Sequence, residues 1–106
     1  MKTINDLEKM SSLELFLHNG TLKGKDKDLE SQLEYWHEKC CTAFNTCMEK
    51  LTKKNYEKLE LAMNTYKSVL DEKVENKSEL ELLQKVARRK GVNLKKHILT
   101  YDELIG

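Results

Sequence analysis

The chain contains no proline, and its four glycines are confined to positions 20, 24, 91 and 106. From Lys25 to Lys90 there is neither proline nor glycine, the residue types that break helices most strongly. This stretch is also richer in Leu, Glu and Lys than in Val, Ile and Thr, whereas a sheet protein of this size needs turn residues at short intervals. The sequence therefore predicts an all-α protein.

Length and composition favour a single helical domain with a modest core. A chain of 106 residues has the common size of one domain and buries only about 60 to 68% of its surface on folding. Charged residues make up 35% of the chain, which is above the usual share of about 25%. Much of the sequence must therefore form solvated helix faces, or a partner must complete the core.

The charges are balanced, with 19 Lys and Arg residues against 18 Asp and Glu residues. Binding to nucleic acid or membrane by bulk electrostatics is therefore not expected and would need a local patch. No apolar stretch approaches the roughly 18 residues of a membrane span, and no targeting segment is visible, so the cytoplasm is the expected location. The lysine- and asparagine-rich composition is typical of an AT-rich bacterial or phage genome, and a phage protein would act in the host cytoplasm.

A first helical segment is predicted over residues 1–19. Two hydroxyl and acid pairs resemble helix starts, namely Thr3 with Asp6 and Ser11 with Glu14. The segment is either one helix or two short helices with a bend near Ser11. Gly20 predicts its end, because glycine closes helix termini without steric cost, and residues 21–25 are predicted to form a loop.

An antiparallel hairpin of two long helices is predicted over residues 26–75. Apolar residues recur there at spacings of three and four, as in amphipathic helices: Leu29, Leu33, Trp36, Cys40, Phe44, Cys47 and Leu51, then Tyr56, Leu59, Met63, Tyr66, Leu70 and Val74. Thr52 as a helix cap, with Leu51 and Tyr56 as a hydrophobic staple, predicts a turn at residues 51–54. One unbroken helix is the alternative, because no Gly or Pro forces the turn.

Residues 78–106 are predicted to form a C-terminal helix and tail. Ser78 and Glu81 match a capping box at the start of this helix, and Gly91 followed by Val92 predicts a Schellman turn at its end. Residues 93–106 fit either a further short helix or an extended tail. The expected fold is a small helical bundle, in which the hairpin is flanked by shorter N- and C-terminal helices.

The three cysteines, Cys40, Cys41 and Cys47, are odd in number and close together, which favours reduced thiols over a disulfide framework. They lack the knuckle spacing of a zinc site, and Cys40 and Cys47 are about 10 Å apart along a helix axis. We therefore expect buried cysteines and neither a metal nor another cofactor. His37 lies one turn from Cys41, yet no nucleophile elbow or phosphate loop accompanies the pair, so no enzymatic activity is expected.

The segment from residue 88 to residue 97 carries five fixed positive charges and no acid: Arg88, Arg89, Lys90, Lys95 and Lys96. Residues 84–99 resemble part of a helix-turn-helix, with Ala87 between the helices and Gly91 in the turn, which implies contact with nucleic acid. The motif normally has apolar residues where this chain has Lys90 and His97. The alternative is that the cations are solvated and complement the negative pole of a helix dipole.

Four apolar residues are candidates for a protein interface: Tyr35, Trp36, Leu61 and Val69. Tyr35 and Trp36 are adjacent, so only one of them can point into the hairpin, and aromatic residues are enriched at interfaces. The expected function is a non-enzymatic protein–protein interaction module that acts as a regulator, adaptor or inhibitor of another macromolecule and forms a homo-oligomer, most readily a dimer. The second expectation is a small DNA-binding transcriptional regulator that uses residues 84–99. No membrane partner is expected.

Overall fold

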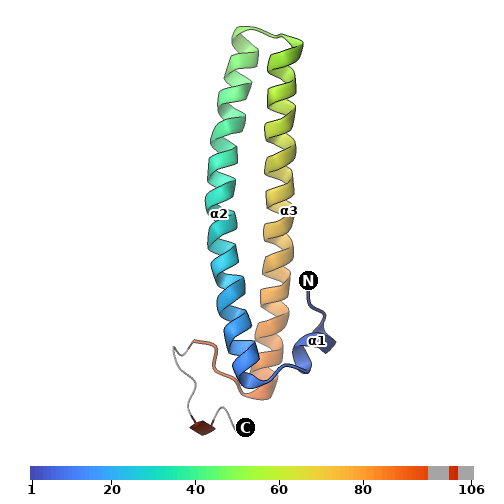
Figure 1. Ribbon diagram of the computed structural model, residues 1–106, viewed down its shortest axis with the longest axis vertical. Coiled ribbons are helices and arrows are strands. Elements are labelled where there is room, and N and C mark those ends of the chain that lie inside the picture. Colours follow the sequence, from blue (N-terminus) through green and yellow to red (C-terminus); the bar gives the residue numbers. More distant parts are fainter. Residues whose placement is uncertain (96–100, 103–106) are drawn as a thin grey trace. The chain divides into compact units, whose positions relative to one another are not determined.

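The computed structural model describes residues 1–95 and 101–102, and this part of the chain contains three helices. Helix α1 spans Ile4–Glu8, α2 spans Ser12–Glu49 and α3 spans Lys53–Lys90 (Figure 1). No strand occurs within the described ranges, which confirms the all-α prediction. None of these helices contains a stretch that is long and apolar enough to cross a membrane.

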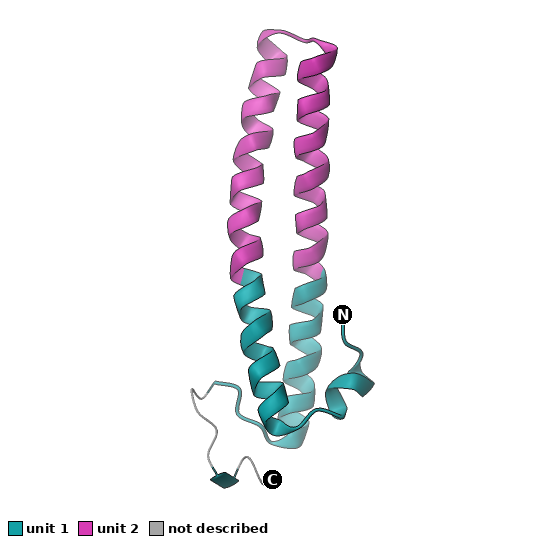
Figure 2. Ribbon diagram, in the orientation of Figure 1, with its two compact units in different colours: residues 1–26, 75–106 teal, residues 27–74 magenta. Residues whose placement is uncertain are grey.

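The chain divides into two compact units, and each unit contains a part of both long helices (Figure 2). The first unit comprises residues 1–26 and 75–106, and the second comprises residues 27–74. Within each unit the α2 segment lies antiparallel to the α3 segment (Figure 2). The predicted helical hairpin is therefore confirmed.

The N-terminal segment bends near Ser11, as the second of the two predicted alternatives requires, but only α1 is short, because the helix that begins at Ser12 continues to Glu49. The Thr3 hydroxyl accepts a hydrogen bond from the Asp6 backbone N–H at 3.3 Å, and the Asp6 carboxylate accepts one from the Thr3 backbone N–H at 3.1 Å. The hydrogen bonds from the Thr3 backbone and hydroxyl hold the pKa of Asp6 below its usual value. Ser11 and Glu14 form the same reciprocal pair at the start of α2.

The predicted loop at residues 21–25 is wrong, because α2 continues through Gly20 and Gly24 without a break. Both glycines are exposed, while buried positions continue past them at spacings of four and three, as Leu15, Asn19 and Leu22. Packing of these residues outweighs the cost of up to about 1 kcal/mol that each glycine imposes inside a helix.

Buried and half-buried residues recur along both long helices at alternating spacings of four and three, which is a heptad repeat. We call these positions the seam. In α2 the seam consists of Leu15, Asn19, Leu22, Asp26, Leu29, Leu33, Trp36, Cys40, Ala43 and Cys47. In α3 it consists of Asn55, Leu59, Ala62, Tyr66, Val69, Lys73, Asn76, Leu80, Leu83 and Ala87. This repeat is typical of knobs-into-holes packing between two helices.

Of the apolar stripe predicted for residues 56–74, Leu59 and Tyr66 lie in the seam, whereas the other four residues each lie one position after a seam residue. Ala62 and Val69 are only 5% and 7% exposed, whereas Met63 and Leu70, which were predicted to be buried, are 45% and 40% exposed. Small seam residues allow the two helix backbones to approach closely, because the distance between packed helices depends on the side chains at the contact. The larger neighbours are thereby displaced to the flank of α3.

The turn between the long helices spans residues 50–52, against the predicted 51–54, and Thr52 caps α3 as predicted. The Thr52 hydroxyl accepts a hydrogen bond from the Asn55 backbone N–H at 3.1 Å, and the Asn55 amide donates to the Lys50 carbonyl at 2.8 Å. These two bonds satisfy backbone groups at the start of α3 and at the end of α2. Leu51 is 77% exposed, so it adds little to the predicted staple.

No new helix begins at Ser78, and the separate C-terminal helix predicted there is wrong. Helix α3 runs unbroken to Lys90 because Asn76, Leu80 and Leu83 keep the heptad spacing across this site. A hydroxyl and an acid three residues apart form a capping box only where the backbone is free to leave the helix. Here the packing of the seam holds it in place.

The end of α3 is the predicted Schellman turn. Gly91 has a φ of +74°, a left-handed conformation that favours glycine. The Gly91 N–H donates to the Arg88 carbonyl at 3.3 Å, and the Val92 N–H donates to the Ala87 carbonyl at 2.8 Å. Val92 is 8% exposed and joins the core, as this motif requires.

The main apolar core of the described residues lies in the first unit. It consists of Leu7 from α1, Leu15 and Leu22 from α2, Leu83, Val86 and Ala87 from α3, and Val92. The second unit buries only Leu29, Cys47, Ala62 and Val69 among its apolar residues. Most of its large apolar side chains are therefore exposed. The tail predicted at residues 93–106 lies largely outside the described residues.

Candidate functional site

Glu79 fastens the N-terminal segment to the hairpin in the first unit. Its carboxylate accepts a hydrogen bond from the Lys2 backbone N–H at 2.6 Å and lies 2.7 Å from His18 Nε2. Burial raises the pKa of this carboxyl, but the hydrogen bonds from Lys2 and His18 outweigh burial, and the pKa lies below its usual value. Glu79 is only 6% exposed, so the group acts as a structural anchor.

The basic segment divides by contact into two parts. The Arg89 guanidinium pairs with the Glu8 carboxylate, and the Lys90 ammonium donates to the backbone carbonyls of Glu8 and Met10. These two cations therefore hold α1 against the end of α3. Such contacts occupy donors that a nucleic-acid phosphate would need.

Arg88 and Lys95, the other described members of this segment, line a cavity in the first unit. Lys96 lies outside the described residues, as do residues 97–99 of the predicted helix-turn-helix. In the described part, residues 84–90 belong to α3 and residues 91–95 form turns and irregular backbone. Arg88 and Lys95 therefore line the same cavity, whereas Arg89 and Lys90 contact the end of α1.

The four predicted interface residues do not form one surface. Val69 is buried in the seam, and Trp36 is a half-buried seam residue. Tyr35 and Leu61 are 53% and 66% exposed, and each lies one position before a seam residue. The Tyr35 ring packs edge-on against the Trp36 ring, with centroids 5.3 Å apart, and the Lys39 ammonium lies 5.3 Å from the Tyr35 ring centroid.

A larger set of exposed apolar side chains lies on the other flank of the seam in the second unit. We call this set the groove face: Phe44, Met48, Tyr56, Met63, Leu70 and Val74. Phe44, Tyr56, Met63 and Leu70 each follow a seam residue by one position, so they share a flank that is opposite to that of Leu61. Met48 and Val74 follow one turn later on the same flank.

The groove face includes a hollow between α2 and α3. A cavity of about 460 Å³ is lined by His37, Cys40, Cys41, Phe44, Asn45, Leu59 and Met63. An adjoining cavity of about 250 Å³ shares His37, Cys40 and Met63 and adds Tyr66. Side chains from both helices therefore line two neighbouring depressions, and hollows of this kind accept apolar side chains of a partner.

The cysteines differ in exposure, which corrects the expectation that all of them are buried. Cys47 is buried and Cys40 half-buried, as seam residues, whereas Cys41 lies one position further along α2 and is exposed. The Cys41 sulfur lies 3.8 Å from His37 Nε2. Among the described residues, no group of three or more His, Cys, Asp or Glu side chains could hold a metal ion.

Sequence reasoning missed the groove face because it assigned Met63 and Leu70 to the seam. A signal was present in the sequence, since apolar residues occur both at the heptad positions and directly after them, as in Ala62-Met63 and Val69-Leu70. Such doubled positions indicate a helix that packs on two sides.

Comparison with known proteins gives no match for this chain, whether with protein-family models, with curated protein sequences or with solved structures.

Proposed function

We propose that this chain is a non-enzymatic protein-interaction module that pairs with a second copy of itself through the groove face. One observation carries the proposal: the second unit exposes six large apolar side chains on one flank of its seam and buries only four apolar residues. Contiguous apolar patches of this kind are unusual on soluble monomers and mark interaction sites.

The positions of these side chains favour another helical hairpin as the occupant. A two-helix coiled coil needs apolar residues only at the two seam positions of each heptad, whereas helices in larger bundles carry a third. Tyr56, Met63 and Leu70 occupy this third position in three successive heptads of α3. Two hairpins that meet through their groove faces would form a four-helix arrangement.

The charges beside the groove face fit a second copy of the same chain. Glu60 and Lys67 are exposed and lie three residues before and four residues after Met63. A two-fold axis near Met63 would place Glu60 of each copy beside Lys67 of the other copy. A two-fold interface uses the same patch on both subunits, so this self-complementary pattern supports a symmetric dimer.

The role proposed for the dimer is that of a regulator, adaptor or inhibitor of another macromolecule. Tyr35 and Leu61 support this role, because they are exposed on the opposite flank and would stay accessible after pairing. A paired module with a second apolar flank has a surface left for a further partner.

Sedimentation of charge variants tests the pairing. The wild-type chain is expected to sediment as a dimer at micromolar concentration, against a monomer mass of 12.4 kDa. Phe44→Glu and Met63→Glu should each produce monomers, because a carboxylate in the apolar contact loses its hydration. Leu61→Glu is the matched control on the opposite flank and should leave the dimer intact.

The same experiment contradicts the proposal in two ways. A wild-type chain that stays monomeric at about 100 µM, well above the concentration at which a standard interface pairs, excludes self-association. A dimer that Leu61→Glu dissociates and Met63→Glu leaves intact places the contact on the other flank. Helical circular dichroism of each variant shows that the hairpin remains folded.

A further inference from the structure

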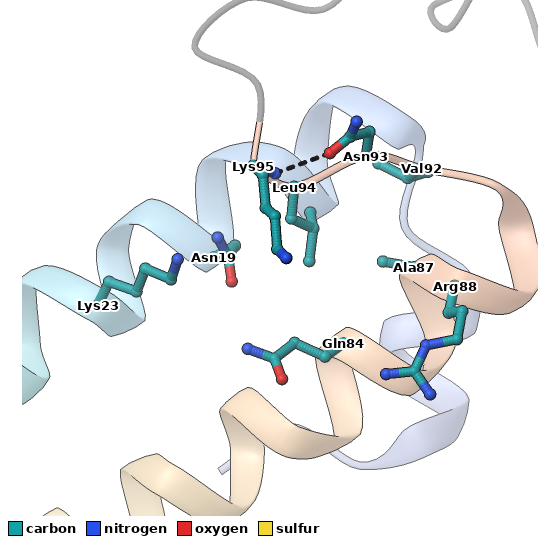
Figure 3. A pocket seen from close by; sticks show the side chains of 9 residues that line it. All are labelled: Asn19, Lys23, Gln84, Ala87, Arg88, Val92, Asn93, Leu94 and Lys95. Atoms are coloured by element: carbon teal, nitrogen blue, oxygen red, sulfur yellow. Dashed lines mark hydrogen bonds between the residues drawn. The ribbon is translucent and has the colours of Figure 1, made fainter.

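We infer that the first unit contains a binding site for a small phosphomonoester, in the cavity of about 510 Å³ between α2, α3 and the segment that follows α3. Its lining comprises Asn19, Lys23, Gln84, Ala87, Arg88, Val92, Asn93, Leu94 and Lys95 (Figure 3). A volume of this size falls in the usual range for small-molecule sites. The site is separate from the groove face, so it does not depend on the proposed dimer.

Three cations and no carboxylate line this cavity. Lys23 comes from α2, Arg88 from α3 and Lys95 from the segment after α3, so the three charges in the wall come from residues distant in sequence (Figure 3). Within the described part of the chain, none of the three forms an ion pair, whereas neighbouring Arg89 pairs with Glu8. The positive charge around the cavity is therefore left for an external anion to neutralise.

A buried amide supplies a second, independent indication of a ligand. Asn19 lies in the cavity wall and is only 4% exposed, and its Oδ1 has no hydrogen-bond partner among the described residues. Asn76, equally buried in the α3 seam, donates to the Leu22 carbonyl at 2.9 Å, and its Oδ1 also has no partner among the described residues, but Asn76 does not line the cavity. An unpaired buried acceptor is costly, and a ligand hydroxyl or amino group that donates to Oδ1 would satisfy Asn19.

The rest of the wall is ordered and partly apolar. Ala87 and Val92 are buried members of the core, and Leu94 packs against it. The Asn93 side chain accepts a hydrogen bond from the Lys95 backbone N–H at 3.0 Å, which fixes the segment that carries Lys95 (Figure 3). A ligand body of low charge can therefore rest against this wall while its anionic group faces the cations.

These features together define the ligand class. Three cations match a dianion better than a single carboxylate, and Arg and Lys are the usual partners of phosphate oxygens. The Asn19 amide requires hydroxyl or amino groups on the ligand body. Sugar phosphates and nucleoside monophosphates share this chemistry, and inorganic phosphate carries the anionic part alone.

Titration of the full chain with three probes distinguishes these sources. We would measure binding of inorganic phosphate, glucose 6-phosphate and adenosine 5′-monophosphate by calorimetry, and follow the side-chain amide signals of Asn19 and Gln84 by NMR. At least one of the two organic phosphates should bind more tightly than about 1 mM and shift the Asn19 signal. Adenosine and glucose, which lack the phosphate, should not bind.

Charge-matched variants test the residues. Lys23→Gln, Arg88→Gln and Lys95→Gln should each weaken binding about tenfold, because each removes one charge-assisted hydrogen bond. Lys25→Gln and Lys85→Gln are the controls, since these lysines are exposed on the same two helices and do not line the cavity. Equal losses in both groups of variants would show non-specific attraction and overturn the assignment.

Two seam variants separate ligand binding from packing. Asn19→Leu and Asn76→Leu both replace a buried amide at a heptad position that ordinarily takes leucine. Asn19→Leu should abolish binding of the phosphomonoester, whereas Asn76→Leu should leave it unchanged. Undiminished binding by Asn19→Leu contradicts the role of this amide.

Two further results would overturn the proposal. One is the absence of binding by all three probes at about 10 mM, a concentration that detects affinities weaker than those of ordinary metabolite sites. The other is binding of duplex DNA that carries no terminal phosphates, with a steep salt dependence that Arg88→Gln reduces. This result would assign these cations to a nucleic-acid surface.

Discussion

At the scale of single residues, Glu79 connects parts of the chain that are far apart in sequence. Its carboxylate accepts a hydrogen bond from the Lys2 backbone N–H and contacts the His18 ring. Lys2 lies at the N-terminus, His18 in α2 and Glu79 in α3. A carboxylate that is 6% exposed is stable only because both partners are present. The free energy of unfolding should therefore depend on this one side chain.

Replacing Glu79 tests this dependence and its pH profile. Because the pKa of Glu79 is lower in the folded protein than its usual value of 4.5, the ionised group stabilises the fold above that pH. This stabilisation is lost as the pH falls through the lower, folded pKa. Glu79→Gln should cost about 1.5 to 3 kcal/mol near neutral pH and should make unfolding less sensitive to acid.

Urea unfolding of the wild-type protein and of Glu79→Gln between about pH 7 and pH 2, at one fixed protein concentration, measures the difference in their free energies of unfolding. The two curves should converge as the pH falls. Asp6, whose pKa is also lowered, is present in both chains and contributes equally to them. Parallel curves over the whole range would show that Glu79 does not carry the acid-sensitive stabilisation.

The structure of some residues could be predicted from local sequence, and that of others could not. Thr3, Thr52 and Gly91 occur at helix ends as predicted, because caps depend on a few neighbouring backbone groups. The exposure of Cys41 depends instead on how α2 is rotated about its own axis relative to α3. The cavity beside Asn19 is formed by three segments, and no local pattern specifies such an assembly.

At the scale of helices, the length of α2 and α3 was the main error of sequence-based reasoning. Gly20 and Ser78 resemble a helix stop and a helix start, yet both lie inside helices of 38 residues. Heptad spacing passes through both sites without a shift. Tertiary packing supplies most of the stability of a helix, so it overrides local signals of about 1 kcal/mol.

Glycine replacements measure this effect directly. Gly20 and Gly24 lie in a helix, and an added Cβ would meet no atom within 4 Å at either position. Gly20→Ala and Gly24→Ala should each raise the free energy of unfolding by about 0.5 to 1 kcal/mol. Gly91→Ala should lower it by about 1 to 2 kcal/mol, because Gly91 has a left-handed backbone conformation.

Thermal and urea unfolding of the three variants at one protein concentration give these values. The contrast in sign is the informative result, since the chemical change is the same at all three sites. Destabilisation by Gly20→Ala or Gly24→Ala would indicate that residues 20–24 are not helical in solution and would restore the loop that the sequence favours.

The rotation of α3 was also beyond sequence-based prediction. Met63 and Leu70 are as suitable for a stripe as Ala62 and Val69, and the choice depends on how closely α2 approaches. Once the smaller pair lies in the seam, the larger pair must lie beside it. The error in rotation and the existence of the groove face therefore have the same physical cause.

At the scale of the whole chain, the two units use their apolar residues differently. The first unit contains an apolar core to which α1, both long helices and Val92 contribute side chains. The second unit contains only two helix segments, and a single seam cannot cover Phe44, Met63 and Leu70. The sequence indicated this imbalance through its apolar stripes and high charge content, and self-association remains the proposal that accounts for it.

Intermolecular contact at Met63 tests the pairing most directly. A sample that mixes chains carrying ¹³C-labelled methionine methyl groups with unlabelled chains allows isotope-filtered nuclear Overhauser measurements between copies. We expect intermolecular contacts from the Met63 methyl group to apolar or aromatic protons of the groove face. A sample that is dimeric by sedimentation yet shows no intermolecular contact at Met63, or one whose contacts arise only beside Leu61 and Tyr35, would contradict this pairing.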